Sequence, residues 1–218
     1  MTILAEAKIV GYTQPSEEFK NDFQDIKDLV AFCARVSNPD NQMNFETADK
    51  LINYLLKHKH FSPFEMASVT VEVTTTRDIA RQLLRHRSLQ FQEWSQRYAN
   101  PTESLGFVLR EARLQDPKNR QNSIETENLE LQQAWDEFQN EVIETSKRAY
   151  DWAIANGIAK EQARAVLPEG LTVSRLYVHG TIRSFIHYIE LRKENGTQKE
   201  HQFLAIAIAK AISQIFKV

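Results

Sequence analysis

The sequence predicts a single helix-rich domain in which a few strands lie between the helices. The chain has 218 residues, of which 42% are hydrophobic and 26% charged, so it is long enough for one large domain with its own core. Only six glycines and six prolines are present, few for a fold built from many tight turns. Several long segments carry apolar residues at helical spacing, and no repeat or low-complexity linker divides residues 1–218.

The amino-terminal part predicts a short strand and two helices. The strand covers Lys8 to Tyr12, and the helices cover residues 25–37 and 47–57. The inward faces are predicted from helical spacing and consist of Ile26, Leu29, Val30 and Cys33 in the first helix and Leu51, Tyr54 and Leu55 in the second. On that face Cys33 is most simply a small buried hydrophobic residue, and a nucleophilic role is the alternative.

A second strand and a third helix follow. Val69, Val71 and Val73 alternate with polar residues, the pattern of a half-buried strand. Thr75 or Thr76 then caps a helix. Its inward residues are Ile79, Leu83 and Leu84, and its basic face carries Arg77, Arg81 and Arg85. A polar stretch from residue 87 to 100 comes next and ends at Pro101.

The second half of the chain predicts mainly helices. Residues 116–123 are interpreted as a mobile loop, and a long helix follows over residues 125–156 with Gly157 at its carboxyl end. That helix carries an apolar stripe of Leu131, Trp135, Phe138, Val142, Ala149 and Trp152. A short helix ending at Pro168, a strand at 171–178, and helices at 182–191 and 199–216 complete the prediction.

Composition excludes several classes of protein. The formal net charge is −2, whereas proteins that bind nucleic acid without sequence preference carry excess positive charge. We find no apolar run of the roughly 18 residues that a membrane helix requires, and residues 1–13 lack the pattern of a signal peptide. One cysteine cannot form an intrachain disulfide or a thiolate zinc cluster, so we expect a cytoplasmic protein without a metal.

The densest functional signal is a basic segment at the end of the third helix. Between Arg77 and Arg97 five arginines face two acidic residues, a local charge of +3 in a chain of net charge −2. Guanidinium groups bind two phosphate oxygens at once, so Arg85, His86 and Arg87 suit one extended anion. A solvated basic helix end is the plainer reading of the same charges.

Four motifs resemble those of the flavin-dependent thymidylate synthases. The signature of that family is Arg-His-Arg, seven residues and then Ser, and it stands here as Arg85-His86-Arg87 and Ser95. Three further segments match in the right order: residues 60–65 (HFSPFE), 163–168 (ARAVLP) and 181–192 (TIRSFIHYIELR). A single Arg-His-Arg would be weak support, but this ordered set covers most of the chain and is specific.

The resemblance implies an α+β fold, a homotetramer with active sites at subunit interfaces, and synthesis of dTMP from dUMP. The carbon donor would be 5,10-methylenetetrahydrofolate, and FAD reduced by NADPH would supply the hydride. The other class of thymidylate synthase attacks uracil with a cysteine, and Cys33 lies far from every motif.

The resemblance also assigns site residues. FAD would be bound by Ser62, Arg85, His86, Arg87 and Glu93, with Thr181, Ile182, Arg183 and His187 from another subunit. Residues expected around dUMP are Gln82, Leu83, Leu84, Arg85, Glu93, Trp94, Ser95, Gln96, Arg97, Arg164 and Arg192. Arg192 would be catalytic, because a cation beside uracil stabilises the ring deprotonated at N3. Ser95 has no evident His–Asp relay and is interpreted as a phosphate ligand.

Two departures from the family and several plainer readings stand beside these assignments. Many members have Asn at the positions of Thr181 and His187, and the position of Gln96 is often Gly. Ser62 could cap a turn, Glu65 could pair with an arginine, and Arg164 could pair with Glu161 on a helix surface.

Two other functions compete with the synthase. A magnesium-dependent nucleotide hydrolase would need clustered carboxylates, whereas Glu125, Glu127 and Glu130 fit a solvated helix face. An RNA-binding module would use Arg85, Arg87 and Phe91, but the net charge and the lack of an aromatic platform argue against it.

Overall fold

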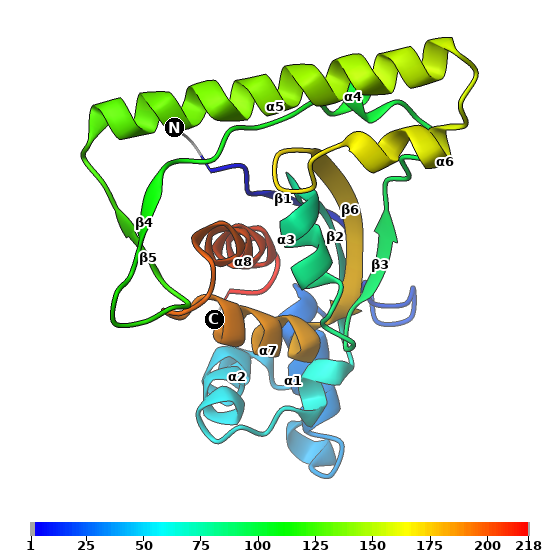
Figure 1. The fold of residues 1–218 in the computed structure, drawn as a ribbon. Helices are drawn as coiled ribbons and strands as arrows, with labels where there is room; N and C mark the ends of the chain where they lie inside the picture. Colours follow the sequence, from blue (N-terminus) through cyan, green and yellow to red (C-terminus); the bar gives the residue numbers. More distant parts are fainter. Residues whose placement is uncertain (1–2, 218) are drawn as a thin grey trace.

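The structure is a computed structural model that describes residues 3–217, and it places helices around one antiparallel sheet (Figure 1). The strands of that sheet run in the order β1-β2-β6-β3, with bounds Glu6–Tyr12, Ser68–Thr76, Val173–Thr181 and Gln90–Glu93. All three pairings are antiparallel, and β2 pairs with β6 over its whole length, from Ser68 opposite Thr181 to Thr76 opposite Val173. A separate hairpin is made of β4 (Arg113–Gln115) and β5 (Ser123–Glu125).

The helices follow the predicted order. Their bounds are α1 Ile26–Ala34, α2 Ala48–Lys57, α3 Arg77–Leu83, α4 Pro101–Ser104, α5 Leu129–Ala155, α6 Lys160–Ala163, α7 Ile182–Arg192 and α8 Lys199–Ile212. Short 3-10 turns lie at Pro39–Asn41, Phe45–Thr47, Ser62–Glu65 and Arg164–Val166. This is the α+β arrangement that was expected, and no helix in residues 3–217 is long and apolar enough to cross a membrane.

The core lies between one face of the sheet and α3, α7 and α8. Val69, Val71 and Val73 are fully buried there, as the alternating pattern predicted, together with Leu204 and Ile208 of α8. The opposite face of the sheet carries polar residues that alternate with these valines and is more open to solvent. The covered face therefore fixes α3, α7 and α8 relative to one another, and most of the predicted site residues lie on α3 and α7, on the segment that follows α3 or at the cap of α7.

Several predicted elements have different bounds or surroundings. The polar stretch 87–100 contains strand β3, which pairs with β6, and most of the predicted loop 116–123 is the turn of the β4–β5 hairpin. Because Glu125 belongs to β5, the long helix starts later, and the side chain of Asn128 caps it by accepting from the backbone N–H of Leu131. The last helix ends at Ile212 instead of Phe216, and the first ends at Ala34.

Three side chains depart from their predicted environment. Tyr54 is 52% exposed because Ile52 and Leu55 fill the inward face of α2, and its ring packs on His58 instead. Cys33 is half-buried, not buried. Arg77, predicted on an open basic face, is buried because it pairs with Glu93 of the neighbouring strand.

Helix α5 crosses the outside of the molecule, above α4 and the rest of the fold (Figure 1). Its buried residues are Gln139, Ser146, Tyr150 and Ala153. The predicted apolar stripe lies roughly 70° around the helix from them, at 100° per residue. That stripe is exposed: Phe138 is 64% and Trp152 63% accessible. At the end of the helix Gly157 has φ +78°, the left-handed conformation that its predicted capping role requires.

Candidate active site

The predicted flavin residues of the last motif lie at the amino-terminal end of α7. Thr181 caps the helix, its hydroxyl accepting from the backbone N–H of Ser184 at 3.2 Å. One turn along the helix, the His187 ring packs edge-on against Phe61 at 4.6 Å. Ile182 is buried in the core, and its backbone N–H already donates to Ala67. The side chain of Ile182 therefore cannot reach a flavin bound at the surface.

The upstream motif 60–65 packs against this same end of α7, within one chain. Arg183 donates to Glu65 at 2.9 Å, so the plainer reading of Glu65 as an ion-pair partner is confirmed. Ser62 is exposed and is the first residue of the 3-10 turn, one position after the cap residue Phe61, and no hydrogen bond of its side chain is found within residues 3–217. The plainer reading of Ser62 as a cap is therefore wrong, and its hydroxyl is available to a ligand.

The signature motif lies at the other end of α7. Arg192 donates from Nε to Nε2 of His86 at 3.0 Å, and the His86 ring meets Tyr188 edge-on at 4.8 Å. Burial lowers the pKa of His86, and the positive charges of Arg192 and Arg85 lower it further. His86 is therefore neutral at pH 7 and can accept the hydrogen bond from Arg192.

The residues just before the signature are less available than the resemblance implies. Leu83 is fully buried and Leu84 half-buried, so Leu83 could contact a nucleotide only through its backbone. The amide of Gln82 is half-buried and engaged by residues of α8. By contrast, Arg85 and Arg87 are exposed on the turn that follows α3.

A third group of predicted residues surrounds the end of β3. Glu93 accepts hydrogen bonds from Arg77 at 3.3 Å, Arg81 at 3.0 Å and the hydroxyl of Ser174 at 2.9 Å. Next to it, residues on β3, the following loop and β6 line a cavity of about 350 Å³. Its lining includes the predicted residues Glu93, Trp94 and Ser95.

The loop after β3 presents its polar groups in different directions. Ser95 accepts from the backbone N–H of Arg97 at 3.3 Å, and the described residues place no histidine or carboxylate in hydrogen bond with its hydroxyl. Gln96 is buried, so its side chain points into the protein. Glu161 pairs with Arg97 at 3.4 Å and not with Arg164, which contradicts the plainer reading of Arg164 as half of a surface pair.

The predicted arginines fall into two classes. Arg97 and Arg183 each pair with a carboxylate. Within residues 3–217, no carboxylate oxygen lies within 4 Å of Arg85, Arg87 or Arg164. Unpaired guanidinium groups suit phosphate oxygens, so these three arginines remain available to an anion.

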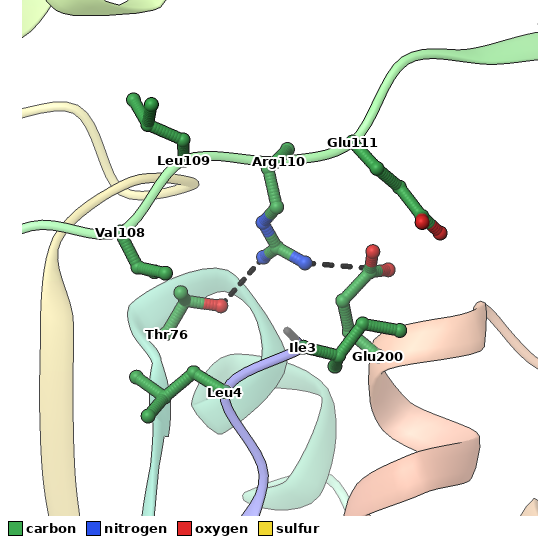
Figure 2. Close-up of a pocket in the computed structure, with 8 residues that line it drawn as sticks. All are labelled: Ile3, Leu4, Thr76, Val108, Leu109, Arg110, Glu111 and Glu200. Atoms are coloured by element: carbon green, nitrogen blue, oxygen red, sulfur yellow. Dashed lines mark hydrogen bonds and ion pairs between the residues drawn. The ribbon is translucent and has the colours of Figure 1, made fainter. Parts of the chain in front are cut away.

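Sequence reasoning missed a group of charged residues on α8 and in residues 108–113. Figure 2 shows Arg110 between Thr76 and Glu200, in a pocket of only about 10 Å³ that has no room for a ligand. Glu200 is buried and pairs with Arg110 at 3.2 Å and Arg113 at 2.6 Å. Burial raises the pKa of Glu200, but the two arginines outweigh it and the pKa lies below its ordinary value.

Among residues 3–217, neither an activated thiol nor a cluster of metal ligands lies at these positions. Cys33 is half-buried, and burial raises the pKa of its thiol, so the reactive thiolate is disfavoured. His58 and His60 lie 6.1 Å apart by ring centroid. Across residues 3–217, no three His, Cys, Asp or Glu side chains gather as metal ligands.

Comparison with known proteins identifies the family. The Thy1 family, described as thymidylate synthase complementing protein, matches residues 20–216. The chain belongs to the Thy1 family. It is 47% identical over 210 residues to a probable flavin-dependent thymidylate synthase of Paramecium bursaria Chlorella virus 1, covering 96% of this chain and 93% of the relative. A flavin-dependent thymidylate synthase of Synechocystis is 43% identical, with 97% and 95% covered.

A solved structure extends the comparison to the fold. The UMP/dUMP methylase PolB of Streptomyces cacaoi, bound with 5-Br dUMP, superposes with a TM-score of 0.78 at 26% identity. The match covers 98% of this chain and 93% of the methylase. The resemblance found in the four motifs is confirmed, and the methylase shares the fold over nearly the whole chain.

Proposed function

We propose that this chain is a flavin-dependent thymidylate synthase, which methylates dUMP reductively to dTMP. The carbon donor is 5,10-methylenetetrahydrofolate, and bound FAD, reduced by NADPH, supplies the hydride. The observation that carries the proposal is the hydrogen bond between Arg192 and His86. It joins the signature motif to the end of the last motif, beside arginines that have no carboxylate partner.

The residues fit an FAD-binding role. Arg85 and Arg87 are exposed and unpaired, which suits the two phosphates of the cofactor. His86 lies between them and is neutral. Ser62, Thr181, Arg183 and His187 offer polar groups at the other end of α7, and the Arg183–Glu65 pair holds that end together. Nine residues of helix separate Arg183 from Arg192, a rise of roughly 14 Å.

In this proposal, the loop after β3 and Arg192 bind dUMP. Ser95, Arg97 and Arg164 would hold the phosphate, with the backbone at Gln96 between them. Glu93 would lie between the nucleotide and the flavin, and its carboxylate is oriented by Arg77 and Arg81. Leu84 would meet the nucleotide beside Gln82 and Arg85, Leu83 would offer only its backbone, and Trp94 lines the adjacent cavity.

Arg192 acts as an electrostatic catalyst. Its guanidinium does not give up a proton at neutral pH, so it stabilises the uracil ring deprotonated at N3 without itself moving a proton. Since Nε of Arg192 is bound to His86, the outer nitrogens remain for the nucleotide. No side chain needs to attack the ring, which agrees with a half-buried Cys33 and an unactivated Ser95.

A homotetramer explains two features of the single chain. The three groups of site residues lie at the two ends of α7 and at the end of β3, and a site formed where subunits meet would bring them together. The stripe on α5 also leaves Phe138 and Trp152 mostly exposed, which is unusual for a protein that functions as a monomer. We place this stripe in a contact between copies of the chain. The assembled enzyme would act in the cytoplasm.

One incubation tests the function. The purified protein is supplied with dUMP, 5,10-methylenetetrahydrofolate, FAD and NADPH, and dTMP is measured by chromatography. We expect dTMP only when all four are present, and a yellow protein with a flavin spectrum. Hydrolysis of the nucleotide, or no flavin binding at all, would favour the hydrolase or RNA-binding alternative. UMP in a parallel reaction tests discrimination of the ribose, since PolB is described as a UMP/dUMP methylase.

A further inference from the structure

The side-chain amide of Gln82 is held on both sides by α8. Its Nε2 donates to Oε1 of Gln198 at 2.7 Å, and its Oε1 lies 3.2 Å from Nδ1 of His201. Gln198 immediately precedes α8, and His201 lies in the first turn of that helix. These contacts join positions more than a hundred residues apart in the chain.

The negative charge of Glu200 decides which group donates and which accepts in each of these hydrogen bonds. Glu200 accepts from Nε2 of Gln198 at 3.0 Å, and its carboxylate can only accept. Gln198 must therefore present its oxygen to Gln82, and Gln82 must present its own oxygen to His201. It follows that His201 carries its proton on Nδ1. Arg110 (Figure 2) and Arg113 hold the Glu200 carboxylate in place through ion pairs.

A purely structural role would not explain a histidine at position 201, because its burial there costs stability. It is fully buried, and within the described residues its Nε2 has no hydrogen-bond partner. A buried polar atom without a partner destabilises the folded state, whereas an apolar side chain of similar size would avoid that cost. Burial, aided by the charge of Arg192, lowers the pKa of His201 to about 3, so the ring stays neutral. Among the described residues, the hydrogen bond that its side chain makes is the one to Gln82.

We propose that His201, with Gln198 and Glu200, is a positioning residue that fixes the orientation of the Gln82 amide and thereby selects uracil over cytosine. This inference rests on the proposed function and on the expectation that Gln82, one of the residues around dUMP, meets the base. Uracil presents an N3–H donor beside the O4 acceptor, and cytosine presents the reverse, an N3 acceptor beside an N4 donor. An amide that rotates by 180° would accept either base, whereas an amide held at both ends recognises one.

Substitutions at His201 separate positioning from packing. In the FAD-loaded protein, His201→Leu removes the donor to Gln82 and keeps an apolar side chain, whereas His201→Asn keeps a donor close to the place of Nδ1. Calorimetric titration gives the Kd of dUMP and of dCMP for each. We expect His201→Leu to weaken dUMP by about tenfold, the scale of one lost hydrogen bond, and to narrow the dUMP-to-dCMP preference. His201→Asn should stay within about threefold of the parent for both nucleotides.

Equal dUMP affinity and equal preference in parent and His201→Leu would overturn the proposal, as would a loss in His201→Asn as large as in His201→Leu. Flavin content and sedimentation of each variant show whether the fold is intact. If the parent itself binds no dUMP, the proposed function fails along with this inference. The ¹⁵N shifts of His201 in the nucleotide-free protein distinguish failure of this inference from failure of the proposed function. A ring protonated on Nε2 would overturn the inference, because Nδ1 could then not donate to Gln82.

Discussion

Arg192 and His86 lie 106 positions apart in the chain, and a 3.0 Å hydrogen bond joins Nε of the first to Nε2 of the second. A guanidinium can only donate, so Nε2 of His86 carries the lone pair and the ring is neutral with its proton on Nδ1. The edge of the Tyr188 ring supports the same imidazole from inside. Arg192 is therefore oriented by a neutral group and is the charged residue of that pair.

Two neutral histidines at this site make stability depend on pH. The pKa of His86 is lowered, and that of His201 is lowered to about 3, mainly by burial. Below the ordinary pKa of about 6.5 the unfolded chain binds protons that the native chain excludes, so stability is fully present above that pH and is lost as pH falls. For His201 the slope approaches about 1.4 kcal/mol per pH unit well below pH 6.5 and persists to about pH 3, and His86 adds to it in the same direction.

Urea unfolding of parent and His201→Leu at pH 7, 6 and 5, at one protein concentration, measures this slope. We expect the free energy of unfolding to fall more steeply with decreasing pH in the parent than in His201→Leu. The difference in slope should be about the contribution of one histidine. Identical slopes in the two proteins would mean that His201 is protonated in the native state or accessible to solvent.

Loss of either exposed signature arginine should release the flavin. Arg85→Ala or Arg87→Ala removes a charge-assisted bond to phosphate, worth about 1.5–3 kcal/mol, without touching the core. We expect both variants to purify folded but colourless, with flavin content read from the visible absorbance. Arg148→Ala on the exposed part of α5 is the matched control and should stay yellow. Full flavin occupancy in both signature variants would refute the assignment.

Ser95→Ala should weaken dUMP binding and leave thymidylate formation intact. Only the backbone N–H of Arg97 is bound to the Ser95 hydroxyl, so no base activates it as a nucleophile. Steady-state kinetics should show a KM for dUMP raised several-fold, about the effect of one hydrogen bond, with kcat near the parent value. A covalent adduct between Ser95 and the nucleotide, seen by mass spectrometry during turnover, would show that its role is different.

A charge placed on the α5 stripe should disrupt assembly. Phe138 is 64% exposed in the single chain, so Phe138→Glu costs little within one subunit but would bury a charge in a contact between subunits. We expect sedimentation to show smaller species that have lost FAD. Lys147→Glu lies on the opposite side of the helix and should remain a tetramer. A Phe138→Glu protein that remains tetrameric and active would show that the interface does not include this stripe.

Sequence alone predicted most of the fold, because the signals were local. The valine alternation of β2 and the glycine after α5 each act over a few residues. Strand β3 was missed because four polar-rich residues become a strand only by pairing with β6, which lies more than eighty positions away. The exposure of the α5 stripe could not be predicted from the sequence either, because periodicity shows that a helix face is apolar but not what covers it.

The candidate site was predicted unevenly for a similar reason. Ordered motifs identified Arg85, Arg192 and their neighbours, and the structure adds the contact between the two motifs. Gln198, Glu200 and His201 escaped notice because a polar helix start is common, and their significance lies in contacts with Gln82 and Arg110 across the fold. Ile182 and Leu83 carry the family pattern, but their side chains belong to the core.

The rate of dTMP formation by two variants tests the central claim, that Arg192 and not a cysteine activates uracil. Parent, Arg192→Ala and Cys33→Ser are compared at saturating dUMP and methylenetetrahydrofolate with NADPH, after equal flavin content has been verified. We expect Cys33→Ser to match the parent and Arg192→Ala to be slower by about 10²-fold or more, the scale of losing an electrostatic stabiliser, while still oxidising NADPH. An inactive Cys33→Ser beside an Arg192→Ala variant of near-parental rate would contradict the account.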